Sequence, residues 1–168
     1  MAYGVQIGNR VKLNAFVYIC NGVTIEDGVM VSAGTIFTND RFPRATTPDL
    51  KQLRPSEPDE HTRPTLVREG ATIGAGCTIG SDLVIGRFAM IGMGSVVTKA
   101  LPDFHLALGY PATSVGCVCR CGQLLPDSHL VRWTTIMSHV WPLARSMRFT
   151  IVCSPSRPRR IMPVCMAK

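Results

Sequence analysis

The chain repeats itself every six residues, and this period constrains its fold more than any other feature. Counted in sixes from Ile7, each hexad begins with an aliphatic residue or Phe, and the frame stops and later resumes unchanged. The first positions are Ile7, Leu13, Ile19, Ile25, Val31, Phe37, Val67, Ile73, Ile79, Ile85, Ile91 and Val97. This period fits neither a helix nor a simply alternating strand, so it indicates short strands separated by corners.

Two further hexad positions support this interpretation. Apart from Arg41 in the interruption, the fifth positions are small or apolar: Val11, Val17, Val23, Val29, Thr35, Ala71, Cys77, Leu83, Ala89, Ser95 and Leu101. The second position is often Gly, whose backbone freedom suits a corner. Three sides close a triangular coil whose hydrogen bonds run between coils, as in a parallel sheet. We predict an all-β, parallel β-helix of about four 18-residue coils; a sandwich of short strands is the alternative.

Residues 38–66 interrupt the repeat with five prolines and many charges, so they are predicted to form one long protruding loop. A loop of this length is uncommon in a compact fold unless it has a function. It is therefore interpreted either as a surface insertion without a role or as an arm that reaches a neighbouring subunit's cleft.

The last residues of the chain differ from the rest. Residues 103–125 are predicted to form a final strand and an extension, and residues 126–168 have no hexad frame. The segment 126–168 holds both tryptophans and seven of the 18 Lys and Arg residues, against Asp127 as its one acidic residue. The net charge of +7 thus belongs mainly to this tail, which argues against nucleic-acid binding by the body of the protein. We expect a β-helix domain over 1–125 and a basic tail over 126–168 that is foreign to the domain, produced by a fusion or a shifted reading frame.

Composition and cysteine content bound the location. No apolar run approaches the roughly 18 residues of a membrane span, and no secretion signal is recognisable at the N-terminus. A cytoplasmic protein is therefore expected. Seven irregularly spaced cysteines predict mostly reduced thiols rather than a disulfide framework. Cys117, Cys119 and Cys121 lack the second pair of a zinc ribbon, so no metal is predicted, with a zinc site as the alternative.

Several segments resemble one group of hexapeptide-repeat acyltransferases, the nucleotide-amino-sugar N-acetyltransferases. FTNDRFPRA (Phe37–Ala45) resembles the beginning of their long loop, and residues 64–80, 94–103 and 109–125 are similar in style. The resemblance implies a left-handed coil, a homotrimer, and transfer of an acetyl group from acetyl-CoA to the 3-amino group of a UDP- or dTDP-linked sugar. Members usually have further coils before the point where this chain starts, and Thr113 stands where they carry Arg or Lys. Both departures are expected to weaken the sugar-nucleotide site.

The resemblance also implies roles within the loop. Asn39 would hold the sugar amine near the thioester carbon, since a carboxamide both donates and accepts hydrogen bonds; otherwise it only turns the chain. His61 would act as general base, as loop histidines do in many hexapeptide acyltransferases, or else it is a solvated side chain. Arg41 and Arg44 would bind the diphosphate through forked hydrogen bonds, unless they are ordinary surface charges.

Coenzyme A in this superfamily lies along an outer groove between subunits. Mapping the GSVVTK stretch onto the family implies that Met93, Thr98 and Lys99 line this groove, with Ala75 one coil before Met93. Lys99 would pair with a phosphate; a solvated lysine at the rim is the alternative.

Two other functions are compatible with a hexapeptide fold. Trimeric carbonic anhydrases need several histidines on the coil faces to bind zinc, and neither repeat block contains one, which argues strongly against this class. A non-catalytic or truncated scaffold stays open, as does acetyl transfer to another small hydroxyl or amine acceptor.

Overall fold

The computed structural model describes residues 2–125, and the predicted tail 126–168 lies outside the described residues. Within the described part the chain is built from short strands. They are β1 (Gln6–Ile7), β2 (Lys12–Leu13), β3 (Val23–Ile25), β4 (Met30–Val31), β5 (Ile36–Phe37), β6 (Thr65–Val67), β7 (Thr72–Ile73), β8 (Thr78–Ile79), β9 (Val84–Ile85), β10 (Met90–Ile91), β11 (Val96–Val97), β12 (His105–Gly109) and β13 (Ala112–Cys117). Among these residues, no helix has the length and apolar character needed to cross a membrane.

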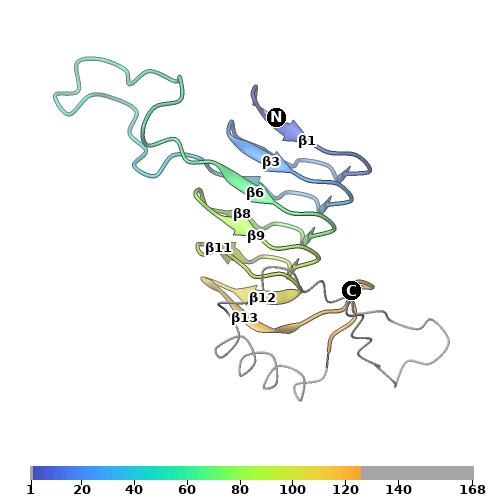
Figure 1. Cartoon of the computed structure of the whole chain (residues 1–168). Helices are drawn as coiled ribbons and strands as arrows, with labels where there is room; N and C mark the ends of the chain where they lie inside the picture. Colours follow the sequence, from blue (N-terminus) through green and yellow to red (C-terminus); the bar gives the residue numbers. More distant parts are fainter. Residues whose placement is uncertain (1, 126–168) are drawn as a thin grey trace, which may run out of the picture.

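The strands form three sheets that the chain visits in turn. Their orders are β1-β3-β6-β9 for the first sheet, β13-β12-β10-β7-β4-β2 for the second and β11-β8-β5 for the third. Within each sheet the pairing is parallel except between β12 and β13. Gln6 pairs with Thr24 and Lys12 with Met30, so each coil lies 18 residues from the next. The result is a stack of coils with three corners, visible edge-on in Figure 1. We call the turns that follow the strands of the first, second and third sheets the first, second and third corners.

The long insertion leaves this register intact. Met30 pairs with Thr72 and Ile36 with Thr78, so the coils before and after the insertion stack directly on each other. Residues 38–64, which we call the arm, leave the prism at the third corner and project sideways from the stack (Figure 1). Strand β6 begins at Thr65, two residues inside the predicted loop, because the Thr65 side chain is buried and its hydroxyl donates to the carbonyl of Gly80 at 3.2 Å.

The interior of the prism confirms the predicted inward stacking. Every first-position side chain from Ile19 to Val97 is buried, and Phe37 is fully enclosed. Ile7 and Leu13 are each 38% exposed, because they lie in the end coil and no other coil in the described part of the chain covers them. Burial of this column supplies the main stabilising free energy of the fold.

The glycines at the second hexad position serve a different purpose from the one predicted. None of them has a positive φ; instead, backbone of the neighbouring coil would lie within 3 Å of a Cβ at Gly8, Gly74 and Gly86. A Cβ on Gly86 would lie 2.3 Å from the backbone nitrogen of Asp103. The left-handed conformation occurs at the fourth position, occupied by Gly4, Arg10, Phe16, Gly22, Gly28, Gly34, Gly70, Gly76, Asp82, Phe88 and Gly94. The corner conformation was therefore assigned to the wrong position of the hexad.

The lower end of the prism is covered by a hairpin. Strand β12 continues the second sheet in parallel with β10, and β13 returns antiparallel to β12. Ala107, opposite Ile91, is buried beneath the last coil. The sequence predicted one final strand here, whereas the structure has two.

Candidate functional site

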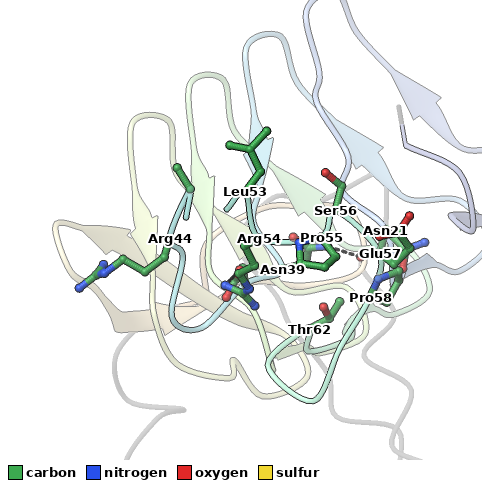
Figure 2. Close-up of a pocket in the computed structure, with 12 residues that line it drawn as sticks. Asn21, Asn39, Arg44, Leu53, Arg54, Pro55, Ser56, Glu57, Pro58 and Thr62 are labelled. Atoms are coloured by element: carbon green, nitrogen blue, oxygen red, sulfur yellow. Dashed lines mark hydrogen bonds and ion pairs between the residues drawn. The ribbon is translucent and has the colours of Figure 1, made fainter. Parts of the chain in front are cut away.

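A cavity of about 340 Å³ lies where the arm leaves the third corner (Figure 2). Asn21 of the prism and residues from both the outgoing and the returning halves of the arm line it. Its lining residues are Asn21, Asn39, Asp40, Arg44, Ala45, Leu53, Arg54, Pro55, Ser56, Glu57, Pro58 and Thr62. A larger, more open hollow of about 620 Å³ beside Arg10 and Asp27 contains none of the predicted site residues.

Asn39 is held in place by a ladder of asparagines at the third corner. Its Nδ2 donates to the backbone carbonyl of Asn21, 18 residues earlier, at 3.2 Å. Asn21 Nδ2 in turn donates to the carbonyl of Tyr3 at 2.9 Å. This bond uses one N–H of the Asn39 amide, so the side-chain oxygen and the second N–H can take further partners. The predicted turn-forming role and the predicted site role are therefore compatible.

The two ends of the arm pair with each other next to Asn39. The backbone nitrogen of Arg63 donates to the carbonyl of Asn39 at 2.8 Å, and Asp40 forms an antiparallel bridge with Thr62. The nitrogen of Arg41 donates to the carbonyl of His61 at 3.2 Å. The arm is thus anchored at its base as a short hairpin.

Arg54 ties the returning half of the arm to this base, and the sequence analysis missed it. Its guanidinium lies 2.8 Å from Asp40 and 2.6 Å from Asp59, and it also donates to the carbonyl of Phe42 at 3.0 Å. The hydrogen bond from Arg54 lowers the pKa of Asp59 to about 2, helped by the backbone N–H of His61. The only sequence signal was an arginine among carboxylates in an aperiodic loop, which does not specify partners.

The other three loop candidates have different positions. Arg44 lines the cavity and donates to the neighbouring carbonyl of Pro43 at 2.9 Å. Arg41 and His61 are not among the lining residues. The Arg41 guanidinium lies over the ring of Phe42 at 5.8 Å, and the His61 ring meets the same ring edge-on at 5.4 Å. The structure therefore places Asn39 and Arg44 in the lining of one cavity, whereas Arg41 and His61 contact Phe42 outside that lining.

The four predicted cofactor residues lie on two neighbouring corners. Ala75 and Met93 follow β7 and β10 at the second corner, where the nitrogen of Gly94 donates to the carbonyl of Ala75 at 2.8 Å. Thr98 and Lys99 follow β11 at the third corner. All four are exposed, and the third sheet lies between the two pairs.

Glycines at the second corner leave the backbone of the coils exposed. In successive coils it carries Gly34, Gly76 and Gly94 at the left-handed position, each preceded by Ala or Met. A Cβ on Gly76 or Gly94 would meet nothing within 4 Å, so backbone at this corner is open to an approaching molecule. Residues with larger side chains would block that approach.

The cysteines depart in part from the prediction. Cys119 and Cys121 form a disulfide and are the exception, among residues 2–125, to the expectation of mostly reduced thiols. A tight turn, in which Gly122 donates to the carbonyl of Cys119, brings their Cα atoms within 5.2 Å. Cys20, Cys77 and Cys117 are free, and within residues 2–125 no group of three or more His, Cys, Asp or Glu has the arrangement of a metal site.

Comparison with known families bears on this arrangement. Residues 4–39 match the family described as bacterial transferase hexapeptide (six repeats). Over these residues the chain is similar to this repeat. The resemblance inferred from the hexads and the FTNDRFPRA segment is confirmed at this level, and the matches imply a left-handed β-helix.

A curated relative extends the comparison across part of the chain. It is the dTDP-3-amino-3,6-dideoxy-alpha-D-galactopyranose 3-N-acetyltransferase of Aneurinibacillus thermoaerophilus, which is 44% identical over 61 residues. The match covers 36% of this chain and 32% of the relative, so the chain aligns with about a third of that enzyme.

Solved structures share the fold. A maltose O-acetyltransferase from Clostridium difficile 630 has 24% identity and a TM-score of 0.58, covering 69% of this chain and 60% of its own. AntD, an N-acyltransferase from Bacillus cereus in complex with dTDP and 3-hydroxybutyryl-CoA, has 19% identity and a TM-score of 0.55, covering 81% of each chain. At these identities the likeness supports the fold alone.

Proposed function

We propose that the protein transfers an acetyl group from acetyl-CoA to the amino group of a nucleotide-linked sugar. The observation that carries this proposal is the 44% identity to an amino-sugar N-acetyltransferase. It is supported by a polar cavity at the root of the arm that contains Asn39 and Arg44. Both co-substrates are metabolites of the cytoplasm, where we expect the reaction to take place.

The cavity suits the acceptor. A free amine is already a good nucleophile, so the protein needs mainly to position it and to stabilise the oxyanion that forms on the thioester carbonyl. Asn39, fixed by its bond to Asn21, is our candidate for contacting the amine. Arg44 is our candidate for the phosphates, whereas Arg41 and His61 face Phe42 and remain secondary candidates.

The bare second corner suits coenzyme A. We propose that the pantetheine arm runs past Ala75 and Met93, where glycines leave the backbone accessible to hydrogen bonding. Thr98 and Lys99 would contact the cofactor from the neighbouring corner. Lys99 occupies in its coil the position that Asn39 occupies two coils earlier, about 10 Å away along the stack by the usual strand spacing.

A homotrimer would bring these two parts together. Within one chain the acceptor cavity lies at the third corner, and the strands of the third sheet separate it from the second corner. We therefore propose that the arm of one subunit meets the second corner of its neighbour, so that the reaction site forms between subunits. Exposed apolar side chains on the arm, Phe42, Leu50 and Leu53, are consistent with such a contact.

The reaction itself needs no group beyond these. The amine lone pair attacks the thioester carbon, the new C–N bond forms, and the C–S bond breaks. The amine proton leaves to solvent or a nearby acceptor, and coenzyme A departs as its thiolate and takes up a proton. The products are the acetamido sugar nucleotide and free coenzyme A.

Thiol release tests the proposal directly. The full chain is incubated with acetyl-CoA and a panel of UDP- and dTDP-linked 3-amino sugars, and free coenzyme A is followed with a thiol reagent. We expect release with one sugar and its loss in Asn39→Ala, while Asn9→Ala, the same change at the first corner, stays active. Release that is independent of any sugar would contradict the proposal.

A scaffold without catalysis is the second candidate. It is favoured by the limited overlap with the relative, which leaves about two thirds of that enzyme unmatched. An intact trimer in sedimentation, together with no thiol release for any amine or hydroxyl acceptor, would support it. Limited proteolysis of the same sample tests whether residues 1–125 form the proposed separate domain.

A further inference from the structure

The charges that line the arm cavity are not equivalent. Resting on the proposed function, we infer that Glu57 and Arg44 form a two-ended specificity device: Glu57 pairs with the acceptor's ammonium as it binds, and Arg44 pairs with its anionic phosphate end. The ammonium then loses one proton to water, and the free amine that results is the nucleophile contacted by Asn39. The device selects amine over hydroxyl acceptors and sets the direction in which the sugar nucleotide lies.

Two carboxylates line the cavity, Asp40 and Glu57. Asp40 already has a partner, because the Arg54 guanidinium lies 2.8 Å from it. Among residues 2–125, Glu57 has neither an ion pair nor a side-chain hydrogen bond. Glu57 is therefore the one carboxylate of the lining whose charge is available to a ligand.

Two arginines also line the cavity, Arg44 and Arg54. Arg54 is shared between two carboxylates, Asp40 and Asp59, so its charge is compensated within the arm. Arg44 contacts only the carbonyl of the preceding residue in the described part of the chain. Its guanidinium keeps free donors in the fork geometry that suits phosphate.

The two free charges lie apart. In Figure 2, Arg44 and Glu57 are at opposite ends of the lining, and Asn39 lies between them in this view. A cation at one end and an anion at the other attract the opposite charges of a dipolar ligand and repel the reversed orientation. A sugar nucleotide with an ammonium at one end and phosphates at the other matches this polarity.

The arrangement gives Arg54 a part as well. By pairing with Asp40 and Asp59, it offsets one of their two negative charges and engages both carboxylates, which would otherwise compete for the ammonium and repel the phosphates more strongly. It also fixes the segment that carries Glu57, which lies between Arg54 and Asp59 in the chain. The polarity of the cavity therefore depends on the internal ion pairs of the arm.

The test compares matched ligands and matched variants. Binding of a dTDP-linked 3-amino sugar and of the same sugar with a hydroxyl at that carbon is measured by calorimetry on the full-length protein. For Glu57→Gln we expect about tenfold weaker binding of the amine, the lower end for a hydrogen bond to a charged group, and unchanged binding of the hydroxyl sugar. Arg44→Gln should weaken both ligands equally. Glu60→Gln, on the same arm but outside the lining, should change neither.

Each result decides the inference. Equal effects of Glu57→Gln on the two ligands, or no effect on either, would overturn it, as would wild-type protein that binds neither sugar. Retention of the wild-type melting temperature in Glu57→Gln excludes a folding defect. In turnover the variant should raise KM for the amine much more than it lowers kcat.

The outcome is separable from that of the proposed function. If the wild type acetylates an amino sugar and Glu57→Gln does so equally well, this inference fails and the activity stands. If the wild type binds the amine more tightly than the hydroxyl sugar but releases no thiol, the activity fails and the charge selection stands.

Discussion

Glycine is required for two different reasons in the coils: close backbone approach at the second hexad position and a positive φ at the fourth. Substituting alanine at each position should separate the two effects. At Gly86 a Cβ would lie 2.3 Å from the nitrogen of Asp103 and 2.4 Å from the carbonyl carbon of Pro102. Both are backbone atoms, so the next coil must move away. At Gly76 nothing lies within 4 Å, but φ is +66°.

The expected costs follow from these differences. Overpacking against backbone costs about 1–3 kcal/mol or more, which we expect for Gly86→Ala. The left-handed conformation costs alanine about 1–2 kcal/mol at Gly76, offset by about 0.5–1 kcal/mol because glycine loses more backbone entropy on folding. Gly76→Ala should therefore be the milder change.

Gly92 provides the control. A Cβ there would meet the end of the Leu108 side chain at 2.1 Å, and Leu108 is 42% exposed and free to turn away. The lower entropy of the unfolded chain then nearly balances the local cost, so Gly92→Ala should be close to neutral.

Thermal unfolding followed by circular dichroism at one protein concentration measures the series. For a chain of this size about 1 kcal/mol shifts the melting temperature by about 2–4 °C. We expect a fall of about 2–12 °C for Gly86→Ala, about 0–6 °C for Gly76→Ala and almost none for Gly92→Ala. If Gly92→Ala is as damaging as Gly86→Ala, close backbone approach is not what requires glycine at the second hexad position.

Three further changes test other parts of the structure. Phe37→Ala empties a fully buried site and should cost about 3–5 kcal/mol in urea unfolding; a loss below about 1 kcal/mol would contradict the packing. Phe16 is 91% exposed with φ of +60°, so Phe16→Asn should raise the melting temperature slightly, and a fall would show that the ring is needed. Because Arg54 lowers the pKa of Asp59 from 3.8 to about 2, this pair stabilises the arm above the ordinary carboxyl pKa and loses effect as the pH falls towards 2. Amide protection factors in the arm, which correct for the intrinsic slowing of exchange in acid, should therefore fall between pH 4.5 and pH 2, and Arg54→Met, but not Lys51→Met, should show low protection at both.

Much of the prism was predictable because its information is local and periodic. A column of first-position side chains needs only that every sixth residue be apolar, and the ten from Ile19 to Val97 are buried as expected. The fourth position could have been found too, since seven of its eleven left-handed residues are glycine. Glycine is also frequent at the second position, and the sequence alone does not show whether a glycine is needed for close packing or for a left-handed backbone conformation.

The site was less predictable. Asn39 and Arg44 emerged from a resemblance to a family segment, and both line the cavity. Arg54 and Glu57 emerged from neither the repeat nor the resemblance, since the arm has no period that relates one residue to another. Which carboxylate pairs with Arg54 depends on how the arm returns to its base through the bridge between Asp40 and Thr62.

The sequence by itself therefore determined the coil, its interior and the corner at which the arm leaves, because each depends on contacts repeated at a constant separation along the chain. Tertiary structure alone decided that a hairpin closes the lower end, that Cys119 and Cys121 are joined, and that Arg54 leaves Glu57 and Arg44 as the free charges of the cavity. Those features depend on how aperiodic segments fold back in space, and no residue spacing encodes that path.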